Sequence, residues 1–174
     1  MYLNDLDKAI TCNFKLYADD VTLYHRIASH QDCSFLQNNL NSFLDWCSRW
    51  QMSQQLHKCE ALCISNKRSL VQFTYYCSNY PLKWSKSVRY LGVVINSRLT
   101  WSDHCRSVCS KAARVLNLLR RKLFCCSTSA KSRAYCVLVL PIFQYSCQVW
   151  RPHYQKDILI LESVQKHAAL AGRE

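Results

Sequence analysis

Glycine and proline are scarce in this chain, which has two Gly and three Pro among 174 residues. Collagen-like segments, low-complexity tracts and Gly- or Pro-rich linkers are therefore excluded. The chain also lacks any run of about 18 or more apolar residues, which a membrane-spanning helix requires. Hydrophobic residues nevertheless make up 49% of the sequence, enough to form a core and too many for a disordered protein. These features predict one globular domain, or a small domain with an appendage.

The N-terminal segment lacks the features of a secretory signal. Asp5 and Asp7 lie where a signal peptide has a basic flank, and no long apolar stretch follows. We therefore expect a nuclear or cytoplasmic protein that is not secreted. The twelve Cys would suit a disulfide scaffold in a secreted chain, but a reducing compartment keeps such thiols free.

No Cys-x-x-Cys pair occurs among these cysteines. The spacings that come nearest to this motif are Cys59/Cys63 and Cys105/Cys109, and His104 lies beside Cys105. On a helix, Cys105 and Cys109 share one face, which suits either core packing or one edge of a zinc site. Free Cys is commonly a small buried apolar residue, so core packing is the preferred interpretation. A small zinc-stabilised interaction protein stays an alternative hypothesis.

Acidic residues are few in the larger part of the chain. The first 60 residues carry five Lys and Arg against seven Asp and Glu, whereas residues 61–174 carry eighteen against four. The formal net charge is +12. A basic segment of this size favours a polyanionic partner, most often nucleic acid. A solvated basic surface and an anionic membrane surface are the alternatives.

The spacing of apolar residues predicts a mixed first half and a helical second half. A hairpin is expected over residues 13–24, because β-prone runs flank two Asp residues that tolerate turn geometry. Steps of three and four predict a helix over 29–50, for which Ser34 is a candidate N-cap residue. Short strands are expected over 59–65, 73–77 and 90–95, and Gly92 in the last suggests a bulge or a close backbone approach.

Beyond about residue 100, amphipathic helices are predicted over 104–124, 129–139 and 157–171, and Pro141 breaks the chain or starts a segment. The first of these helices has an apolar stripe that can be buried while its basic side chains meet solvent or phosphate. Arg106, Arg114, Arg120 and Arg121 fall opposite the stripe, and Lys111 flanks it.

The hairpin carries the clearest chemical signal in the sequence. Adjacent carboxylates at Asp19 and Asp20 can hold hard divalent cations such as Mg²⁺, together with phosphate oxygens and water. Two such metals activate an attacking hydroxyl and stabilise a leaving oxygen in phosphoryl transfer. A bare Asp-Asp pair is most often an exposed turn, but the apolar strands on both sides favour a site.

The string Tyr17-Ala18-Asp19-Asp20 matches the Tyr/Phe-Ala-Asp-Asp signature of reverse transcriptases, and the chain resembles those of non-LTR retrotransposons. Further segments resemble blocks of that family in the same order, so the resemblance covers about residues 2–170. These segments are Leu3-Asn4-Asp5-Leu6, Trp46 to Cys59, Tyr90-Leu91-Gly92-Val93 with Leu99-Thr100-Trp101 and His104, Gln148 to His153, and Leu161 to Lys166.

The resemblance implies a role for each matching residue. Asp19 is expected to be the main ligand of Mg²⁺ or Mn²⁺, with Asp20 supporting the site. Lys58 matches the lysine that protonates the departing pyrophosphate, although by itself it would be interpreted as a solvated surface residue. Two further sets are implied. The primer-contacting set is Tyr17 and Ala18, close to the primer end, with Leu91 and Gly92 in a hairpin that grips the primer strand. The second set, Arg106, Lys111, Arg114, Arg120 and Arg121, would contact a nucleic-acid backbone.

Two departures from the family pattern limit the expected activity. Gln55 stands where the family usually has Asn, three residues before the lysine. The family's other metal-binding Asp and its nucleotide-pocket segment have no counterpart before Tyr17, and neither do the fingers. We therefore expect a truncated enzyme that binds Mg²⁺ or Mn²⁺ weakly and is inactive alone.

The predicted fold class is α+β. The resemblance implies a partial reverse-transcriptase palm of antiparallel strands with helices over residues 1–97, and an all-helical, basic, thumb-like region over 98–174. The expected function is that of an RNA-directed DNA polymerase, with an RNA template/DNA primer duplex as partner and no membrane or evident protein partner. A basic nucleic-acid-binding remnant without catalysis is the alternative.

Overall fold

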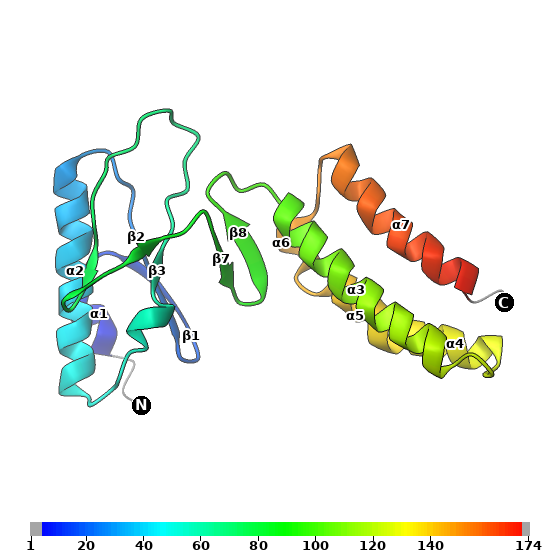
Figure 1. The fold of residues 1–174 in the computed structure, drawn as a ribbon. Helices are drawn as coiled ribbons and strands as arrows, with labels where there is room; N and C mark the ends of the chain where they lie inside the picture. Colours follow the sequence, from blue (N-terminus) through cyan, green and yellow to red (C-terminus); the bar gives the residue numbers. More distant parts are fainter. Residues whose placement is uncertain (1–4, 172–174) are drawn as a thin grey trace. The chain divides into compact units, whose positions relative to one another are not determined.

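The computed structural model describes the backbone of residues 5–171 and the side chains of residues 5–168, so Leu3 and Asn4 of the first matching segment lie outside it. The chain divides into two compact units, Met1–Ser85 and Lys86–Glu174 (Figure 1). Both strands and helices are present, which confirms the α+β class. The boundary expected at 97/98, between a palm region and a helical, thumb-like region, stays a prediction.

A short helix and a hairpin begin the first unit. Helix α1 (Leu6–Ala9) is followed by β1 (Asn13–Tyr17) and β2 (Asp20–Tyr24), which pair antiparallel with Tyr17 opposite Asp20. This confirms the hairpin predicted over 13–24. Half-buried Phe14 and Leu23 lie opposite each other and pack against a buried cluster, so one face of the hairpin is anchored. The buried residues of that cluster are Leu6, Ile10, Cys12, Trp46 and Cys47.

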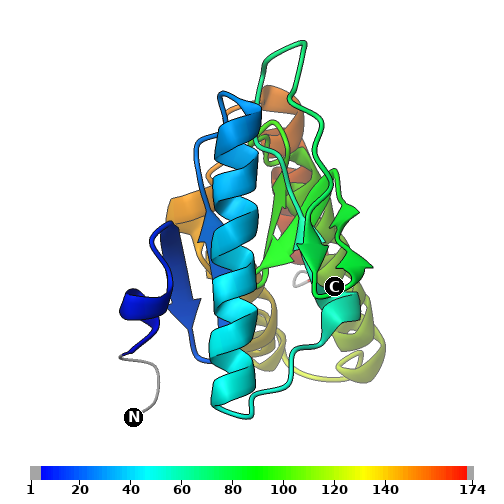
Figure 2. The same cartoon turned by 90° about the vertical axis from the view of Figure 1, so that its left-hand side faces the viewer.

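Helix α2 (His30–Arg49) confirms the helix predicted over 29–50, but Ser29 rather than Ser34 is its N-cap. The Ser29 hydroxyl accepts from the Asp32 amide at 3.4 Å, and the Asp32 carboxylate accepts from the Ser29 amide at 2.8 Å. Asp32 therefore closes a capping box, a role usually taken by Glu or Gln. Ser34 instead donates its hydroxyl to the His30 carbonyl at 3.2 Å. Figure 2 shows α2 lying across the strands of the first unit.

The remaining strands of the first unit are shorter than predicted. The runs over 59–65 and 73–77 contain only two paired residues each, and a single turn of 3₁₀ helix, η2 (Leu56–Lys58), precedes the first. The Gln37 side chain anchors the second run on α2 by accepting from the Tyr76 amide and donating to its carbonyl, both at 2.8 Å. The strands are β3 (Glu60–Ala61), parallel to β6 (Lys83–Trp84), and β4 (Tyr76–Cys77), antiparallel to β5 (Tyr80–Pro81).

The second unit begins with a hairpin in place of the single strand predicted over 90–95. Strands β7 (Ser87–Tyr90) and β8 (Val93–Asn96) pair antiparallel around a turn formed by Leu91 and Gly92. Both turn residues have positive φ, +46° and +80°, as tight two-residue turns require. The single strand predicted from the β-prone run was wrong, because an apolar residue such as Leu91 gives no signal of a left-handed backbone. The hairpin that the resemblance implies at Leu91 and Gly92 is present.

Helices make up the rest of the second unit, and they confirm the basic helical region expected after residue 100. Its core joins β8 to α3, which explains why the β7–β8 hairpin belongs to this unit. Pro141 lies in the first turn of α5, after a π-helical segment. The elements are α3 (Ser102–Lys122), α4 (Thr128–Ala134), the π-helix η3 (Tyr135–Val139), α5 (Leu140–Gln144), α6 (Cys147–Trp150) and α7 (Gln155–Ala171).

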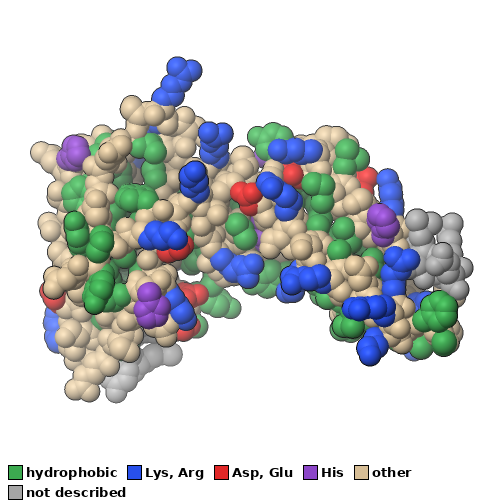
Figure 3. All heavy atoms as spheres, viewed as in Figure 1, with side chains coloured by type: hydrophobic (Ala, Val, Ile, Leu, Met, Phe, Trp, Pro, Cys, Tyr) green, Lys and Arg blue, Asp and Glu red, His purple; other side chains and the backbone are tan. Residues whose placement is uncertain are grey.

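Positive charge is concentrated in the second unit. Residues 86–174 carry fifteen Lys and Arg against four Asp and Glu, whereas residues 1–85 carry eight against seven. Figure 3 shows several Lys and Arg side chains gathered on the surface of the helical unit. Within the described residues, no helix combines the length and apolar character that crossing a membrane requires.

Candidate metal centre and nucleic-acid interface

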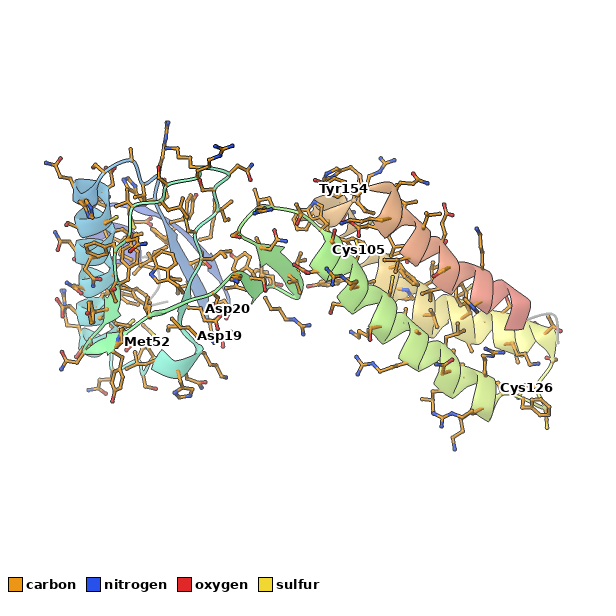
Figure 4. All side chains as sticks on the ribbon, turned by 45° about the horizontal axis from the view of Figure 1, so that its top comes forward. Asp19, Asp20, Met52, Cys105, Cys126 and Tyr154 are labelled. Atoms are coloured by element: carbon orange, nitrogen blue, oxygen red, sulfur yellow. The ribbon has the colours of Figure 1, made fainter. Side chains whose placement is uncertain are left out.

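The two carboxylates lie together at the end of the first hairpin. Ala18 and Asp19 form its two-residue turn, and Asp20 is the first residue of β2, opposite Tyr17 (Figure 4). Ala18 has φ +52°, a left-handed conformation that is uncommon for a residue with a side chain. All four side chains are exposed, so both carboxylates are open to a cation and to phosphate.

No His, Cys, Asp or Glu among the described residues joins Asp19 and Asp20 in a metal-binding group. Neither carboxylate forms an ion pair among these residues, and no group of three or more His, Cys, Asp or Glu is placed to hold a metal. Two carboxylates leave most of the coordination sphere of Mg²⁺ to water or phosphate. The turn therefore has the chemistry of part of a metal site.

A buried side chain, Asn39 of α2, fixes the start of this hairpin. Its carbonyl oxygen accepts from the Thr11 amide at 2.7 Å, the Thr11 hydroxyl at 3.0 Å and the Cys12 amide at 2.9 Å. Its amide group donates to the Phe35 carbonyl at 2.9 Å. Asn39 is only 5% exposed, and the bond to the Cys12 amide is buried, so this side chain links the start of β1 to α2 from inside the unit.

Lys58 is not brought to the two carboxylates by a direct contact. It ends the 3₁₀ helix η2, its side chain is exposed, and it forms no ion pair with Asp19 or Asp20. The same unit has a cavity of about 500 Å³, and none of these three residues lines it. That cavity is lined by Asp5, Lys8, Ala9, Trp46, Arg49 and Trp50.

The predicted basic face of α3 is open to solvent. Its residues are exposed, while Val108, Ala112 and Leu116 on the opposite side are buried in the core of the second unit. Arg106 forms an ion pair with Asp103 at 2.9 Å, which offsets part of its charge. The exposed basic residues are Arg106, Lys111, Arg114, Arg120 and Arg121. Such a face can track a phosphate backbone.

The other predicted primer-contacting pair, Leu91 and Gly92, forms the β7–β8 turn. The Leu91 carbonyl accepts from the Tyr145 hydroxyl at 2.9 Å. A Cβ added at Gly92 would lie 3.0 Å from Cε1 of the same Tyr145 ring, closer than real Cβ atoms usually approach. The close backbone approach suggested by Gly92 is thus confirmed, and Tyr145 is a residue that the sequence pattern had not indicated.

Cys105 and Cys109 pack in the core of the second unit, and His104 is buried beside them. Burial raises the pKa of the Cys105 thiol to about 11, so it stays protonated near neutral pH. His104 accepts from the Val94 amide through Nδ1 at 3.1 Å, which fixes its neutral form. These contacts favour the core-packing interpretation over zinc ligation.

The family and the two relatives that match this chain all carry the description of an RNA-dependent or RNA-directed DNA polymerase. Residues 1–95 match the family described as "Reverse transcriptase (RNA-dependent DNA polymerase)". The chain is 28% identical over 160 residues to the "Probable RNA-directed DNA polymerase from transposon X-element" of Drosophila melanogaster. It is 27% identical over 139 residues to the "Probable RNA-directed DNA polymerase from transposon BS" of the same organism.

These alignments cover much of the chain and little of its relatives. They include 88% and 77% of this chain but span only 17% and 15% of the X-element and BS proteins, respectively. No solved structure matches the chain. The similarity to reverse transcriptases is therefore a similarity of sequence.

Proposed function

Because the chain belongs to the reverse transcriptase family, we propose that it forms part of an RNA-directed DNA polymerase of a non-LTR retrotransposon. The observation that carries this proposal is the β1–β2 turn, which presents Asp19 and Asp20 side by side within the segment matched to the family. Residues 1–97 would then be the C-terminal part of the palm, and residues 98–174 a helical, thumb-like region.

Asp19 and Asp20 would hold Mg²⁺ or Mn²⁺, because carboxylate oxygens are the ligands that these hard cations prefer. When bound, the cation would neutralise charge on the reacting phosphates during nucleotide addition. Tyr17 and Ala18 would lie beside the primer end, since they immediately precede the carboxylates. Lys58 would protonate pyrophosphate or stabilise its charge, which requires it to approach the site when substrates are bound.

The carboxylate pair of this chain is expected to bind metal weakly and to be insufficient for polymerisation. Paramagnetic Mn²⁺ added to the isotope-labelled chain should broaden the NMR signals of residues 18–20, at concentrations on the order of millimolar. Replacing both carboxylates (Asp19→Asn with Asp20→Asn) should abolish the broadening, whereas Asp7→Asn in α1 should leave it unchanged. Broadening that survives the double substitution would remove the basis of the proposal.

Primer extension by the same chain on an RNA template, with Mg²⁺ or Mn²⁺, should yield no product above background. Two carboxylates without a further acidic ligand cannot position both metals of an in-line displacement. The assay measures incorporation of labelled nucleotide into a DNA primer. Robust extension by the unmodified chain would show that the metal site is complete without any further ligand.

Nucleic-acid binding through α3 should depend strongly on salt, because phosphate contacts release counterions. The affinity for an RNA–DNA duplex falls as salt rises, so the slope of log affinity against log salt is negative. Arg114→Gln and Arg121→Gln should each make this slope less steep by about 0.7–0.9. Arg106→Gln should have a smaller effect, since Asp103 already pairs with Arg106 at 2.9 Å. Arg26→Gln, which removes an exposed charge from the first unit, is the control.

A second candidate function is nucleic-acid binding without catalysis. It is favoured by the exposed basic face of α3, together with an acidic turn that has only two carboxylates among the described residues. The two candidates differ in the metal experiment. Strong, salt-dependent duplex binding with no Mn²⁺ effect at residues 18–20 would select the second one.

A further inference from the structure

The tight turn at Leu91 and Gly92 is closed by one side chain from a distant part of the chain. Tyr145 follows α5 and lies 54 residues from Leu91, whose carbonyl accepts its hydroxyl at 2.9 Å. The same ring occupies the space that a side chain at Gly92 would need, with Cε1 at 3.0 Å from an added Cβ. The Tyr145 side chain therefore contacts both residues of the turn.

The position of Tyr145 is itself fixed by a chain of contacts that returns to the hairpin. The Tyr145 carbonyl accepts from Nε1 of Trp150 at 2.7 Å. The buried Trp150 ring meets the His104 ring edge-on at 4.8 Å between centroids. His104 in turn accepts from the amide of Val94, the second residue of β8. The turn, the end of α5, α6 and the start of α3 thus form one closed set of contacts.

The conformation of the turn needs such support. Leu91 has φ +46°, and a residue with a side chain persists in this sparsely populated region only where its surroundings hold it there. Tyr145 remains 56% exposed, so its ring is not needed to fill the core. Its clearest contribution is the hydroxyl bond and the ring contact with the turn.

We infer that Tyr145 is a positioning residue for the Leu91–Gly92 turn, acting on the primer strand through the backbone of that turn. The inference rests on the proposed function, which places Leu91 and Gly92 against the primer. Loss of the Tyr145 hydroxyl leaves the ring beside Gly92 but releases the Leu91 carbonyl, so the turn should become more mobile without losing its fold.

The test compares Tyr145→Phe with Tyr154→Phe in the full chain. The control removes the hydroxyl of another exposed tyrosine of the same unit, one that makes no hydrogen bond to the hairpin. Affinity is measured for an RNA–DNA duplex with a recessed primer 3′ end and for a blunt duplex. The unmodified chain should prefer the recessed end, and Tyr145→Phe should reduce this preference by about two- to tenfold, as expected for one hydrogen bond.

A purely structural role would weaken both duplexes equally, so the ratio of the two affinities reports positioning. Amide hydrogen exchange should also become faster at residues 91–94 in Tyr145→Phe and stay unchanged in Tyr154→Phe. If the unmodified chain shows no preference for the recessed end, the proposed primer contact fails and the inference fails with it. If that preference exists and Tyr145→Phe retains it, the inference alone is overturned.

Discussion

His104 shows how one residue of the matching segments serves the fold rather than the chemistry. It is 3% exposed, its Nδ1 accepts from the Val94 amide, and its ring packs on Trp150. Because Nδ1 is an acceptor, the proton of the neutral ring is on Nε2, for which no partner is found among the described residues. Protonation of Nδ1 would break the bond to β8.

Burial, and secondarily the charge of Arg89, lowers the pKa of His104 below its usual 6.5. The unfolded chain therefore binds this proton more readily than the folded chain does. The stabilising contribution is complete above about pH 6.5 and is lost as the pH falls toward the lowered value. We expect the second unit to become less stable as the pH falls below about 6.5.

Urea denaturation at a series of pH values measures this effect. His104→Gln should lower stability at pH 7 and flatten the pH dependence, whereas His153→Gln, at an exposed position, should preserve the slope. An unchanged pH dependence in His104→Gln would show that another group is responsible.

At the scale of elements, α2 positions the carboxylate hairpin, and its first turn depends on a capping box. The Asp32 carboxylate accepts from the amides of Ala28 and Ser29, and these bonds lower its pKa. Ser29→Ala should destabilise the first unit by about 1 kcal/mol, because the Asp32 amide loses its acceptor. The free energy of unfolding in urea provides the measurement.

Ser34→Ala is the matched control for the cap. It removes a hydroxyl from the same helix end, but one that only returns to the His30 carbonyl. This variant should leave stability unchanged within about 0.5 kcal/mol. Equal losses in the two serine variants would contradict the assignment of Ser29 as the N-cap.

At the scale of the whole molecule, the chain consists of two compact units with separate cores. Substitutions in different cores should therefore act independently. Asn39→Leu leaves the Thr11 and Cys12 amides without an acceptor and should cost on the order of 2–4 kcal/mol. Gly92→Ala places a side chain at φ +80° against Tyr145 and should cost about 1–3 kcal/mol.

The double variant tests this independence. Residue-resolved hydrogen exchange should show Asn39→Leu affecting only the first unit, Gly92→Ala only the second, and the sum of both effects in the combination, within about 0.5 kcal/mol. The exposed Asn38→Leu is a control for the first substitution. Transfer of either effect into the other unit would mean that the two units unfold cooperatively.

The local periodicity of apolar residues was enough to predict the first hairpin and the long helices from the sequence alone. Alternation around Asp19 and Asp20 was sufficient for the hairpin, because strand pairing across a two-residue turn is a short-range event. Steps of three and four were sufficient for α2, α3 and α7, whose buried and half-buried positions repeat with the helical period. Family-specific strings then pointed to the carboxylate turn as the candidate site.

Only the tertiary structure decided which side chains hold these elements in place. Asn39 bonds Thr11 across 28 residues and Tyr145 bonds Leu91 across 54, and no periodic pattern reveals such pairs. The cap at Ser29 and the turn at Leu91 depend on backbone dihedral angles that the residue types at these positions do not by themselves specify. The sequence therefore determines the acidic turn and the amphipathic helices, whereas long-range packing decides how firmly, and by which residues, the turns are held.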